Sequence, residues 1–385
     1  MEIIKQLGFL AENIALLADW RYVAMWVIGG VLIYLAIRHK MEPTLLLPLG
    51  FGTILVNIPL SGAVDKITDG VVEQEGALST LFNAGIANEL FPLILFIGIG
   101  AMIDFGPLLS NPKLMIFGAA AQFGIFFTFC VASMFFDIKE AASIGIIGAA
   151  DGPTAIVVAN KLLGADSKIT GAIMVAAYSY MALVPIIQPP VIKLLTTKKE
   201  RLIRMPYETK NVSKLTKILF PIAITVIAGI VAPESVSLIG FLMFGNLIRE
   251  CGVLNSLSET AQNVLANLIT IFLGITIACQ MQAEKFLRAE TLLILGLGLF
   301  AFIFDTAGGV LFAKFINLFL KKKINPMIGA AGISAFPMSG RVVHKMGLAE
   351  DPQNFLLMHS IGVNVSGQIA SVIAGGLILN FFMGG

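Results

Sequence analysis

The chain has 385 residues, of which 57% are hydrophobic and only 13% are charged, and its mean hydropathy is +0.89. This composition excludes an ordinary soluble domain, so most of the chain is expected to be surrounded by lipid. The formal net charge of +2 is spread over short loops, which argues against a nucleic-acid partner. Cys130, Cys251 and Cys279 show no paired spacing and predict neither a disulfide framework nor a metal site.

Apolar stretches of about 17–25 residues, the length of a helix that crosses ~30 Å of hydrocarbon, recur along the chain. Residues 1–20 carry acids among apolar residues and predict an amphipathic surface helix rather than a cleaved signal peptide. The expected spans that follow are 22–37, 44–60, 89–107, 114–136, 171–192, 215–232, 236–250, 261–281, 291–320 and 355–382. The sequence therefore predicts an all-α polytopic membrane protein with about 10–12 membrane segments.

Two of these segments are expected to be broken helices. Residues 140–160 and 326–345 contain Gly, Ser, Pro and charged residues within apolar sequence, where an unbroken helix would have none. A broken helix frees backbone carbonyls inside the membrane, where they can face an ion or a water-filled cavity.

Lysine and arginine indicate the orientation. They gather at Arg38 and Lys40, between Lys193 and Lys217, and at residues 321–323, and these loops are expected on the cytoplasmic side. The acidic loop 61–89 then lies outside, and the predicted path leaves both chain termini outside.

A weak internal repeat links the two broken stretches. Ile147-Gly-Ala-Ala150 recurs 181 residues later as Ile328-Gly-Ala-Ala331, and each copy follows a long apolar span. On the predicted path the first stretch enters from outside and the second from the cytoplasm, so we expect inverted repeats, as in secondary transporters. The expected organisation is an N-terminal segment (1–20), a pair of spans with an external loop (21–88), a first repeat (89–205), connecting helices (206–255) and a second repeat (256–385).

Asp151, in Gly148-Ala-Ala-Asp-Gly-Pro-Thr154, is the strongest candidate site. A carboxylate within a membrane segment costs at least ~2.5–3.5 kcal/mol unless it is paired, hydrated or neutralised. Neighbouring carbonyls and the Thr154 hydroxyl offer hard oxygen ligands around one negative charge, which suits a hard cation. The alternative is a helix cap at a surface turn.

The second broken stretch offers further candidates. Asn325, next to Pro326, either caps a half-helix or provides an amide oxygen for sodium. Arg341 is either a basic residue of the cytoplasmic side or a guanidinium that holds a carboxylate by two hydrogen bonds. Ser334 adds a hydroxyl between them.

Three polar features of the long spans remain open. Asn364, in Gly362-Val-Asn-Val-Ser-Gly-Gln368, either bonds a neighbouring helix or lies near the membrane midplane. Tyr178 and Tyr180 are either interface tyrosines or partners of a carboxylate. Asp305 and Lys314 either pair with each other or mark a bend in the span 291–320.

Three motifs in combination resemble the β subunits of the sodium-transporting carboxylic acid decarboxylases, a family that includes oxaloacetate, methylmalonyl-CoA, glutaconyl-CoA and malonate enzymes. They are Ile147–Ala155, the segment Asn325–Arg341 and Asn364-Val-Ser-Gly-Gln368. The likeness runs from about residue 20 to the C-terminus.

The resemblance implies a multi-subunit machine in the bacterial cytoplasmic (inner) membrane. A carboxyltransferase α subunit moves a carboxylate to biotin on a carrier protein, and the β subunit decarboxylates this carboxybiotin. Sodium is driven outward and an external proton is consumed. A small membrane γ or δ subunit belongs to such complexes, and a homo-oligomer is compatible with them.

Site residues follow from the same resemblance. Asp151 corresponds to the sodium-binding acid, Asn325 and Asn364 to sodium ligands, and Ser334 to a residue of sodium and proton handling. Arg341 lies at the position suited to carboxybiotin, and a catalytic tyrosine falls on Tyr178 or, with a small shift, on Tyr180.

A rival interpretation is a stand-alone secondary transporter, either a sodium–proton antiporter or a sodium-coupled carboxylate carrier. An inverted repeat would suit it equally well, and it would need no partner. The decarboxylase interpretation instead requires a biotinylated partner, and leaves the choice of carboxylic acid or acyl-CoA to another chain.

Overall fold

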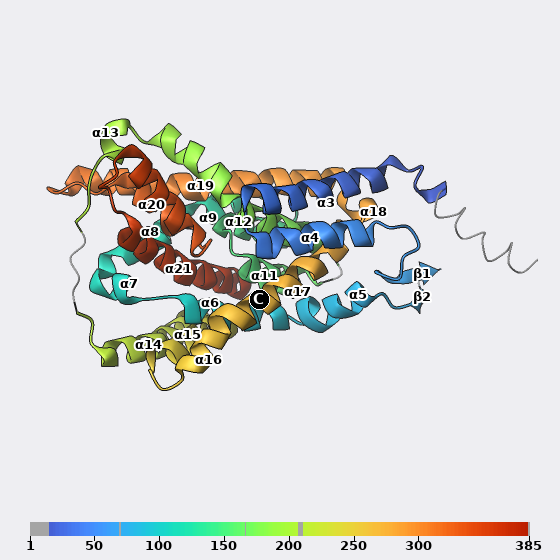
Figure 1. Cartoon of the computed structure of the whole chain (residues 1–385), viewed down its shortest axis with the longest axis horizontal. Coiled ribbons are helices and arrows are strands. Elements are labelled where there is room, and N and C mark those ends of the chain that lie inside the picture. Colours follow the sequence, from blue (N-terminus) through green and yellow to red (C-terminus); the bar gives the residue numbers. More distant parts are fainter. Residues whose placement is uncertain (1–14, 69–70, 166, 207–210, 384–385) are drawn as a thin grey trace, which may run out of the picture.

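The computed structural model describes residues 15–68, 71–165, 167–206 and 211–383. Most of the predicted amphipathic segment 1–20 lies outside the described residues. Within them, helices form nearly all of the regular structure (Figure 1).

The α-helices of ten residues or more are α3 (Trp20–His39), α4 (Pro43–Val56), α6 (Leu90–Met102), α9 (Phe123–Ala132), α11 (Gly152–Leu163), α12 (Lys168–Leu195), α14 (Lys214–Val231), α15 (Val236–Glu250), α17 (Ala266–Ile277), α19 (Ala289–Phe319), α20 (Met338–Glu350) and α21 (Leu357–Met383). The shorter α-helices are α5 (Ala77–Phe82), α7 (Gly106–Ser110), α8 (Met115–Ala121), α10 (Ile138–Gly145), α13 (Lys198–Arg201), α16 (Asn255–Glu259) and α18 (Ala283–Phe286).

Short 3₁₀ and π turns join several of these helices. The 3₁₀ turns are η2 (Pro112–Leu114), η3 (Ile146–Ala149), η4 (Pro233–Ser235), η6 (Ala278–Met281) and η7 (Pro326–Gly332). The π turns are η1 (Asn83–Ala87) and η5 (Thr260–Leu265).

Seven helical stretches of the described chain are long and apolar enough to cross a membrane, which confirms the all-α polytopic prediction. They are Trp20–His39, Pro112–Ala132, Lys168–Leu195, Lys214–Val231, Asn255–Met281, Ala289–Phe319 and Leu357–Met383. The pair Ala77–Ala87 and Leu90–Met102, bent by 62°, makes an eighth if it counts as one span. The remaining expected segments are the shorter helices α4 and α15 and the two broken stretches.

Helix α4 ends earlier than the predicted span 44–60. It stops at Val56, and the Asn57 side chain donates to the carbonyls of Thr53 and Met281, both at 2.8 Å. Pro59 follows, and a residue that precedes proline is disfavoured in the helical region. The amide of Asn57 therefore fastens the end of α4 to the end of the span Asn255–Met281.

The loop after α4 contains a hairpin that the sequence did not indicate. Strands β1 (Lys66–Thr68) and β2 (Val71–Gln74) pair antiparallel. The hairpin lies at one end of the molecule, on the right in Figure 1, and α13 lies at the opposite end. The predicted external loop and the densest basic run of the sequence are thus far apart.

Both predicted broken stretches are confirmed. In the first, the 3₁₀ turn η3 separates α10 from α11, and Ala150 between them adopts a left-handed φ of 51°. In the second, η7 is followed by a stretch without regular helix until α20 begins at Met338. Pro153 and Pro337 stand at the starts of the helices that follow. The inverted relation of the two stretches remains a prediction.

Glycines bring η7 against two long helices. A Cβ on Gly329 would lie 2.0 Å from the carbonyl oxygen of Gly309 in α19, and a Cβ on Gly367 of α21 would lie 2.0 Å from that of Gly332. Only glycine permits backbones to approach so closely. The segment η7 is therefore held between α19 and α21 by its backbone.

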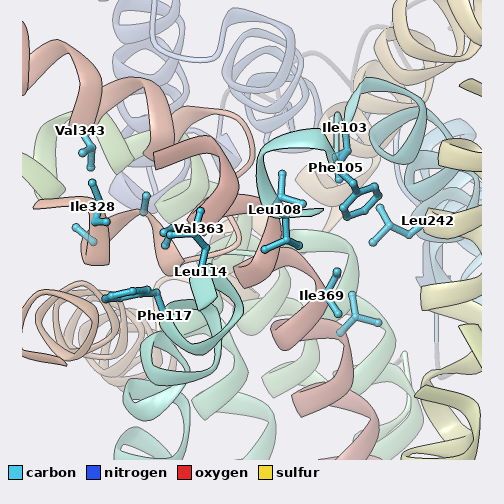
Figure 2. Close-up of a cluster of buried hydrophobic side chains, with 14 of the residues drawn as sticks. Ile103, Phe105, Leu108, Leu114, Phe117, Leu242, Ile328, Val343, Val363 and Ile369 are labelled. Atoms are coloured by element: carbon cyan, nitrogen blue, oxygen red, sulfur yellow. The ribbon is translucent and has the colours of Figure 1, made fainter. Parts of the chain in front are cut away.

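A large apolar core supports this arrangement. Figure 2 shows side chains from α7, η2, α8, α15 and the turn between α6 and α7 meeting side chains from η7, α20 and α21. The residues labelled there are Ile103, Phe105, Leu108, Leu114, Phe117, Leu242, Ile328, Val343, Val363 and Ile369. The second broken stretch thus packs into the same core as helices of the first half of the chain.

Candidate functional site: a carboxylate between two broken helices

Asp151 lies in the interior, between η3 and α11. Its exposed fraction is 3%, and although it occupies the position before the first residue of α11, its side chain does not cap that helix. Its Oδ2 instead accepts a hydrogen bond of 2.7 Å from the Thr154 hydroxyl. The alternative of a cap at a surface turn is therefore wrong, because the carboxylate is buried.

Helix α21 supplies the other partners of this carboxylate. Gln368 Nε2 donates to Asp151 Oδ2 at 2.9 Å, and the Ser371 hydroxyl donates to the same oxygen at 3.0 Å. Helix α11 can approach α21 closely here because Gly375 has no side chain: a Cβ would lie 2.7 Å from Thr154 Cγ2. Three polar donors from two helices thus converge on one carboxylate oxygen.

Ser334 joins the two broken stretches directly. Its backbone N–H donates to the carbonyl of Ala149 at 2.9 Å, and its hydroxyl donates to the carbonyl of Gly367 at 3.1 Å. Ala149 is the last residue of η3, and Ser334 lies just after η7. The two segments that the repeat predicts to correspond are therefore in contact, two residues from Asp151.

Asn364 lies at the same junction. Its Nδ2 donates to the carbonyl of Ile333 at 2.7 Å, while its Oδ1 is buried without a hydrogen-bond partner. A buried amide oxygen without a partner is costly, so its presence calls for an explanation such as an ion or a water molecule. This oxygen is a free acceptor close to the carboxylate-bearing segment.

Tyr178 is the tyrosine that lies at the site. It is fully buried, its hydroxyl has no hydrogen-bond partner, and its ring lies against Gly152, where a Cβ would be 2.4 Å from Cε2. Tyr180 instead donates its hydroxyl to the carbonyl of Leu295 in α19. An interface position is therefore excluded for Tyr178, whose ring contacts the residue that follows Asp151.

Asn325 occupies the other end of η7. Its Oδ1 caps the turn by accepting from the N–H of Met327 at 3.1 Å, and its Nδ2 donates to the carbonyls of Arg201 and Ile203 at 2.8 and 2.9 Å. No described hydrogen bond links Asn325 to Asp151. In this structure Asn325 fastens the start of η7 to the loop that follows α13.

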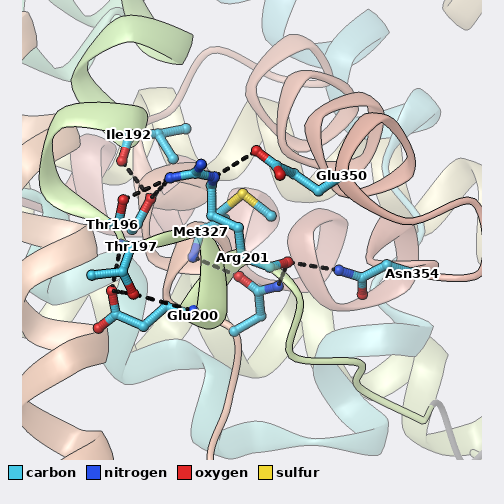
Figure 3. Close-up of polar contacts among 9 residues, drawn as sticks. Ile192, Thr196, Thr197, Glu200, Arg201, Met327, Glu350 and Asn354 are labelled. Atoms are coloured by element: carbon cyan, nitrogen blue, oxygen red, sulfur yellow. Dashed lines mark hydrogen bonds and ion pairs between the residues drawn. The ribbon is translucent and has the colours of Figure 1, made fainter.

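That loop is itself tightly held (Figure 3). Arg201 Nε pairs with Glu350 at 2.6 Å, its Nη1 donates to the carbonyl of Thr196 at 2.6 Å, and its own carbonyl accepts from Asn354 at 2.9 Å. The contacts tie the end of α12, the start of η7 and the end of α20 together.

Arg341 is exposed on the first turn of α20. Its positive charge acts on Glu42, at the start of α4, where burial raises the pKa of the carboxyl and Arg341 lowers it. The guanidinium therefore lies at the surface, on the helix that follows the second broken stretch.

Sequence reasoning missed some of the polar contacts around the site. Ser371 was not singled out, although it lies three residues after Gln368 and so shares its helix face. Gln188 is fully buried in α12 and donates to the Ala330 carbonyl and the Ser339 hydroxyl, both at 2.7 Å. Only its position before Pro189-Pro190 could have drawn attention to it.

Asp305 and Lys314 do not pair, and α19 runs through both without interruption. Lys314 Nζ lies 3.2 Å from Glu200 and donates to the carbonyl of Leu195. Asp305 accepts from the N–H of Ile125 at 3.1 Å. The pairing of the two residues is therefore wrong, and a bend of the span remains a prediction.

The comparison with protein families decides what kind of protein carries this site. Residues 21–382 match the family described as the Na+-transporting oxaloacetate decarboxylase beta subunit. The chain belongs to this family. The resemblance inferred from the three motifs is thereby confirmed, and the Asp151 segment and the junction with η7 both lie within the matched range.

Individual relatives agree. The chain is 49% identical to the methylmalonyl-CoA decarboxylase subunit beta of Propionigenium modestum over 378 residues, which are 94% of each chain. It is 48% identical to that of Veillonella parvula, over 98% of this chain and 96% of the relative. It is 44% identical to the oxaloacetate decarboxylase beta chain of Klebsiella pneumoniae, over 93% of this chain and 94% of the relative.

Family membership establishes the general activity. The chain is a multi-pass membrane subunit of a sodium-translocating decarboxylase, and as a β subunit it works within a complex of several chains. Relatives that act on different acids match it to similar extents, so the identity of the acid does not follow from the comparison.

Proposed function

We propose that this subunit decarboxylates carboxybiotin and uses the reaction to move sodium outward, with uptake of an external proton. The observation that carries the proposal is the buried Asp151 carboxylate at the contact of two broken helices, with three donors converging on it. Moving one charge against 100 mV costs about 2.3 kcal/mol, so export requires a driving reaction.

A single carboxylate can couple sodium to protons because it binds one or the other. Sodium requires the ionised form, whereas a proton neutralises it. Asp151 with bound sodium and Asp151 with a bound proton would each be a neutral unit that can be tolerated within the membrane. Alternation between these states exchanges one cation for the other.

The ligands proposed for sodium surround the junction. Asp151 provides the charge, Asn364 provides the amide oxygen that has no partner in the structure, and Ser334 provides a hydroxyl. The family resemblance also gives Asn325 a role in sodium binding. Because the amide of Asn325 is bonded to three backbone groups here, we propose that in this conformation it positions η7.

Carboxybiotin would be received on the exposed side of α20. The Arg341 guanidinium can hold its carboxylate by two hydrogen bonds. In the reaction the bond between the biotin nitrogen and the carboxylate carbon breaks, carbon dioxide leaves, and the nitrogen takes up one proton. We propose that the Tyr178 hydroxyl, which has no hydrogen-bond partner, passes protons between Asp151 and the path to this reaction.

The partners follow from the chemistry. Carboxybiotin must be presented by a biotin carrier protein charged by a carboxyltransferase α subunit, and a small γ or δ subunit completes the complex in the bacterial inner membrane.

A stand-alone secondary transporter would need none of these chains. Purification of the tagged chain from native membranes should co-isolate a biotinylated protein that avidin detects. A preparation without such a protein would favour the stand-alone transporter.

Replacement of Asp151 with Asn tests the function. Asn preserves size but cannot carry the charge, so we expect sodium-22 accumulation in inverted vesicles to fall to the passive leak while the complex still assembles. Asp104→Asn is the matched control, because Asp104 is a partly exposed acid whose Oδ1 bonds the N–H of Gly106. Undiminished accumulation by Asp151→Asn would end the proposal.

A further inference from the structure

A second acid is buried within the membrane, away from the site described above. Asp305 lies in the middle of α19 with an exposed fraction of 1%. Its Oδ1 accepts from the N–H of Ile125 at 3.1 Å, and its Oδ2 has no hydrogen-bond partner. Ile125 stands in the first turn of α9, where the span Pro112–Ala132 is interrupted at Gln122. The carboxyl group therefore meets the N-terminal end of a helix within the membrane.

Two glycines lie close to this carboxyl group. A Cβ on Gly124 would lie 2.2 Å from Asp305 Oδ1, and a Cβ on Gly148 would lie 2.6 Å from Oδ2. Gly148 belongs to η3, three residues before Asp151. The free oxygen of Asp305 thus touches the backbone of the first broken stretch, on the side of it that faces α19.

No charged side chain compensates Asp305. The ionisable groups on the elements packed against it all have other surroundings. Cys130 of α9 is exposed, and Lys139 and Glu140 stand in the first turn of α10, with Glu140 bonded to the N–H of Asp137. In α12, Lys168 and Lys193 stand at the two ends of the helix, the Tyr178 ring lies against Gly152, and Tyr180 bonds the Leu295 carbonyl. Segments α8, η3 and η7 carry no ionisable side chain. Asp305 takes part in none of the ion pairs of the described residues, and Lys314 of its own helix pairs with Glu200.

The surroundings favour a proton over a metal cation. A hard cation takes about six oxygen ligands. A Cβ on Gly148 would lie 2.6 Å from Asp305 Oδ2 and 2.9 Å from the methyl group of Ala301, so η3 and α19 pack closely beside this oxygen and leave little space for a hydrated ion. An ionised carboxylate whose described partners are only backbone N–H groups at the start of α9 would be under-compensated at this depth. A proton neutralises it and occupies no space.

We propose that Asp305 is a proton-binding site that holds a proton in this conformation and exchanges it when η3 moves against α19. The carboxylate takes up one proton to form the neutral acid and later releases the same proton, so no other reactant is needed. Movement of Gly148 would open Oδ2 to water or to polar backbone and stabilise the ionised form. That this proton is the one consumed in decarboxylation rests on the function proposed above.

Infrared spectroscopy of the purified complex tests the site without requiring transport. We expect a carbonyl stretching band of a protonated carboxyl group that shifts in deuterium oxide, changes when sodium replaces potassium, disappears in Asp305→Asn and persists in sodium-free Asp151→Asn. Asn retains an acceptor for the N–H of Ile125, so this variant should fold. If it does not assemble, Asp305→Glu replaces it, and the band should move rather than vanish.

Two results would overturn the proposal. In the first, no protonated carboxyl band disappears in Asp305→Asn, or none shifts in Asp305→Glu. Asp305 would then be ionised and would serve only as a cap of α9. A band that belongs to Asp305 but responds neither to deuterium oxide nor to sodium would show a permanently buried acid. The band of Asp305 is read separately from the transport loss of Asp151→Asn, so failure of either proposal can be recognised by itself.

Discussion

At the residue scale, two glycines determine how closely other groups approach Asp151 and Tyr178. Gly152 lets the Tyr178 ring lie against the backbone beside the carboxylate, and Gly375 of α21 lets this helix approach Thr154 of α11. A side chain added at either glycine would displace its neighbours, because the interior of a protein is closely packed. The identity of these glycines is therefore part of the geometry of the carboxylate.

Gly152→Ala should disturb the site without removing any polar group. The new methyl group would overlap the Tyr178 ring, and such overpacking costs about 1–3 kcal/mol. We expect the sodium concentration for half-maximal decarboxylation to rise at least several-fold, measured with the reconstituted complex.

Gly296→Ala in α19 is the matched control for that variant, because a Cβ there has no atom within 4 Å. It should behave as the unaltered protein. Equal sodium dependence of the two variants would contradict the packing of Tyr178 against Gly152.

At the scale of elements, the start of η7 depends on the loop after α13. Asn325 bonds two carbonyls of this loop, and Arg201 holds the loop to Glu350 at the end of α20 (Figure 3). The side chains of Arg201 and Glu350 are 14% and 17% exposed, so the pair is shielded from solvent. The second broken stretch is therefore held by a network that includes an ion pair at its start, and by hydrogen bonds of Ser334 near Asp151.

Arg201→Gln should loosen this anchor. Removal of one partner of a fully buried ion pair costs about 3 kcal/mol, and this partly buried pair should cost less, because the remaining charge keeps some contact with water. We expect a lower Tm of the purified protein than for Arg288→Gln, which replaces an arginine whose described side-chain bond goes to the backbone carbonyl of Glu284. Equal Tm values for the two variants would show that the loop does not hold η7.

The broken stretches and Asp151 could be predicted from the sequence because their signals are local. Charge, Gly and Pro within apolar runs conflict with an unbroken helix, whatever surrounds them. The roles of Gln188, Ser371 and Asp305 could not be predicted in the same way. Their partners lie far away in the sequence, and Ala330 and Ile125 contribute only backbone groups, which leave no signal in residue type.

Over the whole molecule, the two broken stretches meet at one junction. Ser334 bonds Ala149 across it, α19 packs on both stretches, and α21 supplies the donors to Asp151. An interruption is tolerated within a membrane only where its free backbone groups find partners in the protein or in water. Here each stretch provides some of the partners of the other, so movement of one must change the bonds of the other.

Direct binding of sodium by the purified β chain tests the central claim, that the acid at this junction carries the ion. Equilibrium binding of sodium-22 above neutral pH should show a saturable site in the unaltered chain and in Asp104→Asn, and no saturable site in Asp151→Asn. Saturable binding of equal affinity in Asp151→Asn would contradict the account.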